Sequence, residues 1–139
     1  MIKQLSVFIE NEVGSLAEVT NIIKDNDINI KAIASLDTPE FAILRLVVDK
    51  PEKAKKALAN KGYVLKMSDA IAVELEDEVG ALNNLLNDIA ESKFSLNYIY
   101  SFILRNGKAP LIVFNTDNME ETVIVLRNKG YLITSLEDA

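Results

Sequence analysis

The sequence of 139 residues contains no cysteine, no histidine and no tryptophan. Without cysteine and histidine, the chain cannot form disulfides, thiolate or imidazole metal sites, or the Ser-His and Cys-His pairs of nucleophilic catalysis. Proline occurs three times and glycine five times, so we expect each to mark a turn or a helix end. Much enzyme chemistry is thereby excluded, and we expect a non-catalytic protein with no metal and no cofactor.

Basic residues are also scarce, and the formal net charge is −6. Residues 1–67 hold ten Lys or Arg against nine Asp or Glu, whereas residues 68–139 hold five against twelve. An acidic surface repels phosphate backbones and anionic lipids, so neither nucleic acid nor a membrane surface is an expected partner. No apolar stretch approaches membrane-spanning length and the N-terminus lacks a signal-peptide pattern. These absences predict a soluble, cytoplasmic protein.

One segment of the sequence occurs twice. Glu10–Leu16 (ENEVGSL) returns as Glu76–Leu82 (EDEVGAL), each time between a β-like apolar segment and a helical pattern. The strand before it repeats as well, because the alternating apolar residues of 5–9 recur at 71–75, with a constant shift of 66. The chain is therefore interpreted as two copies of one unit, with domains at residues 1–68 and 69–139.

Each copy has the pattern β-α-β-β-α-β. The first helix of each copy has an apolar stripe, formed by Leu16, Val19, Thr20 and Ile23 or by Leu82, Leu85, Leu86 and Ile89. Two hairpins follow, 28–36 with 41–48 and 94–104 with 111–116, and the second turns through Arg105–Lys108. Each second helix begins at a segment with a candidate side-chain cap, Asp49–Glu52 or Asp117–Glu120, and ends at Gly62 or Gly130. Last strands are expected near 64–67 and 132–135.

This order predicts an α+β protein made of two ferredoxin-like units. With right-handed crossovers, each unit forms a four-stranded antiparallel sheet with both helices on one face. No linker separates the units, because the last strand of the first copy leads directly into the first strand of the second across residues 66–69.

With that order and the two glycine turns, the chain resembles the ACT domain family, whose small regulatory units bind amino acids in metabolic enzymes. It is most similar to proteins made of two ACT units in tandem, and the resemblance rests on Glu10–Ile33, Phe41–Ala57 and Glu76–Ile99. The usual turn of the family has proline before glycine, where this chain has Val13 and Val79, each with an N–H that proline lacks. The resemblance implies units paired side by side into an eight-stranded sheet, with ligands in the seam between units.

The two turns are candidate sites for the carboxylate of an amino acid. A glycine turn that leads into a helix exposes free backbone N–H groups at the positive end of the helix dipole. The resemblance adds an Asn or Asp before the turn and a polar residue early in the second strand, with oxygens for the ammonium group. The predicted ligand-binding residues are Asn11, Glu12, Val13, Gly14, Ser15, Leu16 and Asn29 in the first unit and Asp77, Glu78, Val79, Gly80, Ala81, Leu82 and Ser95 in the second.

Both sets of residues also allow an interpretation without a ligand. Asn11, Glu12, Asp77 and Glu78 can cap the helices and interact with their dipoles, as such residues do in many non-binding proteins. Tyr98, Tyr100 and Phe102 alternate along one strand, which favours packing in a core or between units over a pocket wall or a dimer face.

Other functions on the same fold lack the residues that they require. An acylphosphatase-like hydrolase needs an arginine in the loop after the first strand, and neither turn contains one. An RNA-binding module of the RRM type needs stacking aromatics that 41–48 does not supply. We therefore expect a regulatory protein that binds an amino acid, forms a homodimer and acts on another protein such as an amino-acid biosynthetic enzyme. The alternative is an interaction protein or regulatory subunit of such an enzyme that binds no ligand.

Overall fold

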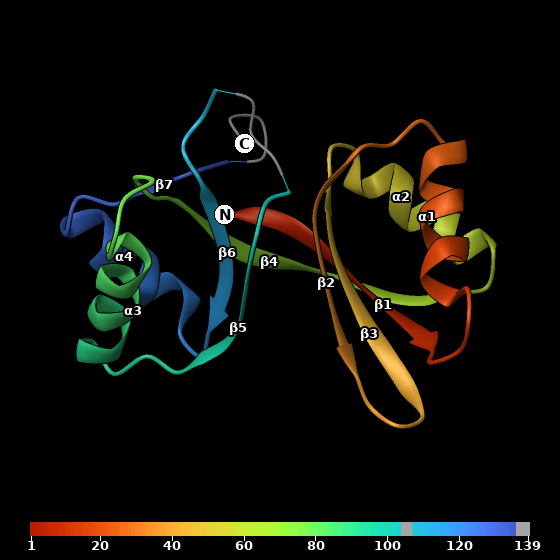
Figure 1. Ribbon diagram of the computed structural model, residues 1–139, viewed down its shortest axis with the longest axis horizontal. Helices are drawn as coiled ribbons and strands as arrows, with labels where there is room; N and C mark the ends of the chain where they lie inside the picture. Colours follow the sequence, from red (N-terminus) through yellow and green to blue (C-terminus); the bar gives the residue numbers. More distant parts are fainter. Residues whose placement is uncertain (104–106, 136–139) are drawn as a thin grey trace. The chain divides into compact units, whose positions relative to one another are not determined.

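The computed structural model describes residues 1–103 and 107–135 (Figure 1). It divides into an N-terminal unit, Lys3–Asp69, and a C-terminal unit, which runs from Ala70 onward and includes Met1 and Ile2. Each unit contains the order β-α-β-β-α-β, and the predicted fold class is confirmed. Within the described residues, no helix has both the length and the apolar character needed to cross a membrane.

The N-terminal unit is a four-stranded sheet with two helices on one face (Figure 1). Its elements are β1 (Ile2–Glu10), α1 (Ser15–Asp25), β2 (Ile30–Asp37), β3 (Phe41–Val48), α2 (Pro51–Asn60) and the first part of β4 (Val64–Glu74). The strand order is β2-β3-β1-β4, and both β1 and β2 are antiparallel to β3. Strands β1 and β2 are therefore parallel to each other, so that Glu10 and Asp37, their last residues, lie at the same end of the sheet.

The C-terminal unit repeats this arrangement. Its elements are the second part of β4, α3 (Ala81–Glu91), β5 (Leu96–Ser101), β6 (Leu111–Thr116), α4 (Met119–Asn128) and β7 (Leu132–Ile133). Strand β4 pairs antiparallel with β6 and with β7, and β5 pairs antiparallel with β6. Each unit has its own apolar core between sheet and helices, which includes Leu44 and Leu58 in the first and Phe114 and Leu126 in the second.

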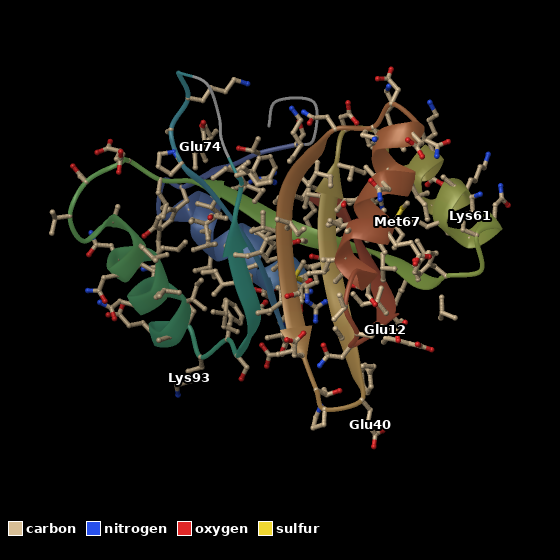
Figure 2. The ribbon with its side chains drawn as sticks, turned by 45° about the vertical axis from the view of Figure 1, so that its right-hand side comes forward. Glu12, Glu40, Lys61, Met67, Glu74 and Lys93 are labelled. Carbon is tan, nitrogen blue, oxygen red and sulfur yellow. The ribbon has the colours of Figure 1, made fainter. Side chains whose placement is uncertain are left out.

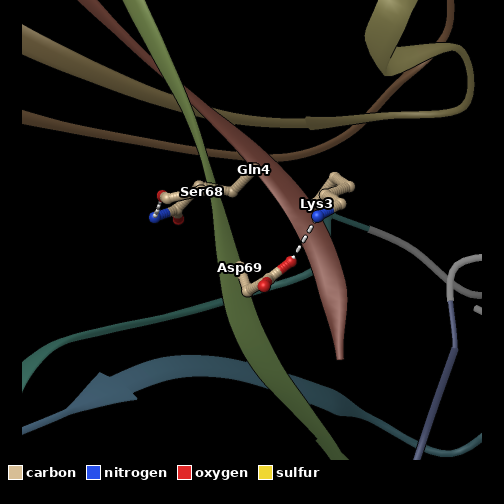
Figure 3. Close-up of polar contacts among 4 residues, drawn as sticks. All are labelled: Lys3, Gln4, Ser68 and Asp69. Carbon is tan, nitrogen blue, oxygen red and sulfur yellow. Dashed lines mark hydrogen bonds and ion pairs between the residues drawn. The ribbon is translucent and has the colours of Figure 1, made fainter.

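Strand β4 belongs to both units. The sequence predicted two successive strands here, and they form one continuous strand because residues 64–75 contain no glycine or proline to interrupt it. The described residues consequently contain seven strands instead of eight. Side chains also join β4 to β1 within the N-terminal unit (Figure 3): Lys3 Nζ lies 2.7 Å from Asp69 Oδ1, and Gln4 Nε2 donates to Ser68 Oγ at 3.3 Å.

The predicted helix stripes are confirmed except at their first residue. The stripe residues that are buried in the two cores are Val19, Ile23, Leu85 and Ile89. Leu16 and Leu82 are 42% and 44% exposed, because they lie in the first helical turn beside an exposed corner of the chain. On β5, Tyr98 and Tyr100 are half-buried and their ring centroids lie 6.1 Å apart, while Phe102, which directly follows the strand, is buried.

The predicted side-chain cap is present on one second helix and absent from the other. At α4, Asn118 Oδ1 accepts the N–H of Glu121 at 3.3 Å, which confirms the prediction for that segment. Helix α2 begins at Pro51 without a side-chain cap, and Asp49 instead accepts the N–H of Asn29. Of the predicted turn Arg105–Lys108, Arg105 and Asn106 lie outside the described residues, as does Leu104 at the end of the predicted strand.

Candidate functional site

A strand leads into a helix through the same backbone turn in both units. We call these turns, with the first residues of the helix, the N-terminal corner (residues 11–17) and the C-terminal corner (residues 77–83). Gly14 has φ +85° and Gly80 has φ +87°, a conformation that glycine adopts at no steric cost. The N–H of Glu12 donates to Glu10 O at 3.0 Å, and the N–H of Glu78 donates to Glu76 O at 2.9 Å. The sequence repeat is therefore also a repeat of geometry.

Within the part of the chain that the structure describes, no side chain caps either helix at these corners. Gly14 and Gly80 occupy the N-cap positions of α1 and α3. Neither helix donates an N–H to a capping side chain among the described residues. Asn11 uses its side-chain Nδ2 to donate to the Thr38 carbonyl at 3.2 Å, across to the turn between β2 and β3. The alternative in which these side chains serve as hydrogen-bonding caps is therefore wrong.

Several backbone N–H groups at the corners have no backbone acceptor within the described residues. Ser15 N–H donates to Glu12 O at 3.3 Å and Glu18 N–H donates to Gly14 O at 2.9 Å, so these two groups are engaged within the turn. The C-terminal corner engages the amides of Ala81 and Asn84 in the same way. Among the described residues, the amides without a backbone acceptor are those of Val13, Gly14, Leu16 and Ala17 and those of Val79, Gly80, Leu82 and Asn83. Both corners can therefore donate hydrogen bonds to an anion.

The N-terminal corner borders a cavity of about 350 Å³, which we call the β2 cavity. One wall comes from the corner and includes Glu12, Ser15 and Leu16; Figure 2 shows Glu12 beside the beginning of α1. The other wall comes from the end of β2 and includes Ser35 and Asp37. A volume of this size lies at the lower end of the range for small-molecule sites. Free amides and carboxylates thus border one space that can hold a small ligand.

Two of the predicted site residues lie far from the corners within their units. Asn29 precedes β2, where its N–H donates to Asp49 Oδ1 at 2.9 Å and its carbonyl accepts the N–H of Asp49 at 3.1 Å. Ser95 makes the same pair of bonds with Asp117, at 2.9 and 3.1 Å. Because an eight-residue strand spans about 23 Å, Asn29 is at the opposite end of β2 from the β2 cavity. The lining residues of the β2 cavity that were not predicted are Ile9, Glu10, Ala17, Ser35, Asp37 and Ala42.

The other predicted residues divide into those that line a cavity and those that face solvent. Val13 and Val79 are fully exposed and line no cavity described for either unit. In the C-terminal unit, Glu78 and Ala81 border a cavity of about 420 Å³, whereas Asp77 and Leu82 do not. That cavity corresponds to a second one of about 320 Å³ in the N-terminal unit, on the side of the corner that faces β4.

A tyrosine lines each of these two corresponding cavities. Tyr63 donates from its hydroxyl to Glu18 Oε1 at 2.6 Å, and Tyr131 donates to Asp88 Oδ2 at 2.5 Å. Burial, followed by the hydrogen bond and the charge of the carboxylate, raises the pKa of both tyrosines to about 12. Each tyrosine joins the turn after the second helix to the first helix of its unit, which holds the corner helix in place.

These tyrosines predict a loss of stability in alkaline solution. An unfolded chain ionises tyrosine near pH 10, whereas the folded protein keeps Tyr63 and Tyr131 protonated up to about pH 12. Their stabilising contribution is therefore complete below pH 10 and disappears as the pH rises to about 12. Urea unfolding at pH 8 to 12 should show a steeper fall for the wild type than for a Y63F/Y131F variant. An equal dependence of stability on pH in both proteins would contradict the raised pKa values of these two tyrosines.

The fold and the duplicated corners define a protein of two tandem ferredoxin-like units, each with an open helix N-terminus. The family model for the ACT domain pair matches residues 1–137, and the chain belongs to this family. The predicted resemblance is thereby confirmed. A search of curated proteins finds no match.

Solved structures agree with this assignment. Protein BT0572 from Bacteroides thetaiotaomicron superposes with a TM-score of 0.90 at 31% identity, over 99% of this chain and 94% of that chain. The regulatory subunit of aspartate kinase from Thermus thermophilus, in its ligand-free form, gives a TM-score of 0.62 at 13% identity over 92% of each chain. The corresponding subunit from Thermus flavus gives 0.61 at 15% identity, over 90% of this chain and 88% of that one. At such identities the two kinase subunits show likeness of fold alone.

Proposed function

We propose that this protein is a non-catalytic regulatory protein that binds an amino acid at the N-terminal corner. The observation that carries the proposal is the β2 cavity, where unpaired helix amides and carboxylates border one small space. The ligand's carboxylate accepts hydrogen bonds from the amides of Leu16 and Ala17. Its ammonium group interacts with Asn11 Oδ1, which accepts no hydrogen bond within the described residues.

Binding at this corner can regulate a partner if the ligand favours one arrangement of the protein over another. The solved relatives named as regulatory subunits of aspartate kinase support an enzyme of amino-acid metabolism as that partner. We further propose domains at residues 1–68 and 69–139, a homodimer and a cytoplasmic location. A ligand position in a seam between ACT units stays a prediction.

A thermal-shift screen with the twenty amino acids and their biosynthetic relatives tests the proposal. A ligand that binds only the folded protein at a hundredfold excess over its Kd should raise the Tm by about 5–10 °C. If none of these compounds changes the Tm, the protein instead acts through protein contacts alone. That second function is favoured by Val13 and Val79, which present fully exposed apolar side chains at the tips of both corners.

A further inference from the structure

We infer that Asp37 makes the β2 cavity selective for a basic amino acid, and that the C-terminal unit lacks a carboxylate at the equivalent position. The inference rests on the proposed function, because it concerns the ligand of the same cavity.

The ionisable side chains that line the β2 cavity are all acidic. They are Glu10, Glu12 and Asp37, and no lysine or arginine lies among the lining residues. None of the three carboxylates forms a side-chain hydrogen bond or an ion pair within the part of the chain that the structure describes. A zwitterion with a neutral side chain adds no net charge to this space, whereas lysine or arginine adds one positive charge. The lining therefore favours a basic ligand over a neutral one and disfavours an acidic one.

Asp37 is held beside the corner by the chain itself. The side chain of Asn11 donates to the carbonyl of Thr38, the residue that follows Asp37, and so ties the end of β2 to the corner. Opposite Asp37 in the sheet stands Ala42, whose small side chain also lines the cavity and leaves room beside the carboxylate. A ligand with its carboxylate at the amides of α1 can thus extend its cationic side chain toward Asp37.

The C-terminal unit offers a comparison within the same chain. Ser35 stands opposite Leu44, and Ser101 stands opposite Ile112, so the two serines occupy equivalent positions. Two residues further along, Asp37 corresponds to Ile103, which is 62% exposed. The repeat therefore keeps the serine and replaces the carboxylate at this one position with an apolar side chain.

Calorimetric titration of D37N tests this assignment, with L-lysine, L-arginine, L-leucine and L-glutamate as probes at one ionic strength. The wild type should bind the two basic amino acids most tightly. D37N should weaken L-lysine binding about three- to fivefold, as expected for an exposed ion pair, and change L-leucine binding less than twofold. D25N is the matched control, because Asp25 is exposed at the end of α1 and does not line the cavity. I103D should strengthen L-lysine binding at the C-terminal corner.

Two outcomes would overturn the inference in different ways. If L-leucine or L-glutamate binds as tightly as L-lysine, or if D37N has no more effect than D25N, the selectivity is not due to Asp37 and the proposed function still stands. If none of the four probes binds and no amino acid in the thermal-shift screen raises the Tm, both the inference and the proposed function are rejected. Circular dichroism of D37N confirms that any loss of binding occurs in a folded protein.

Discussion

Replacement of Gly14 by valine is expected to abolish amino-acid binding at the N-terminal corner while the protein stays folded. Gly14 has φ +85°, where a β-branched residue is destabilising by about 1–3 kcal/mol. An added Cβ at this position meets no atom within 4 Å, so the strain arises in the backbone and not from a clash. The corner relieves the strain by changing its dihedral angles, and this moves the amides of Leu16 and Ala17 away from the ligand's carboxylate.

The measurements are the Kd of the best ligand from the thermal-shift screen and the free energy of unfolding in urea. G62V supplies the matched control, since Gly62 has φ +89°, has equally open space and does not line the β2 cavity. Both variants should lose similar stability, and only G14V should lose more than tenfold in affinity. G80V reports on the C-terminal corner in the same way. Unchanged affinity in both G14V and G80V would place the binding site elsewhere.

The order of elements was predictable because two copies of the pattern support each other. A short apolar run at 5–9 could belong to a strand or to a helix, but its recurrence at 71–75 before the same glycine turn favours a strand in both places. The structure contains both strands, in β1 and β4. The continuity of β4 was predictable in part, because residues 64–75 contain no glycine or proline and no linker separates the two copies there.

The sequence motif points to the corners of the candidate site, whereas its second wall follows from the sheet topology. Asn29 was selected because the resemblance supplied a polar residue early in the second strand. The strand order of the sheet makes β1 and β2 parallel, so the part of β2 nearest the corner is its end. That argument identifies Ser35 and Asp37 from topology alone. Motif position selected Asn29, at the other end of the strand, and a role for Asn29 in binding stays a prediction.

The helix caps show where local sequence is insufficient. Lys50 occupies in α2 the N-cap position that Asn118 occupies in α4, and an ammonium group cannot accept a hydrogen bond from the helix. Asp49 could act as a cap by residue type, but its carboxylate accepts the N–H of Asn29, 20 residues earlier in the chain. Whether a carboxylate accepts from a nearby helix N–H or from a distant N–H depends on the fold, and the local sequence does not contain that information.

Truncation of the core leucine of either second helix is expected to destabilise the protein strongly. Leu58 in α2 and Leu126 in α4 occupy equivalent positions, and both side chains are fully buried in the core of their unit. L58A and L126A should each lower the free energy of unfolding by about 2–5 kcal/mol, because each leaves a cavity where apolar contacts existed. This loss is a large part of the free energy of unfolding of a typical protein, which is roughly 5–15 kcal/mol.

Urea unfolding monitored by circular dichroism measures both losses. K56A is the matched control in α2, since Lys56 is exposed on the same helix and its truncation should change stability by no more than about 0.5 kcal/mol. The two leucines test the two cores separately, and a comparable loss in both would show that each unit depends on its own sheet-to-helix packing. A loss for L58A no larger than that for K56A would mean that α2 does not pack on its sheet, and the position of Tyr63 beside α1 would then be wrong as well.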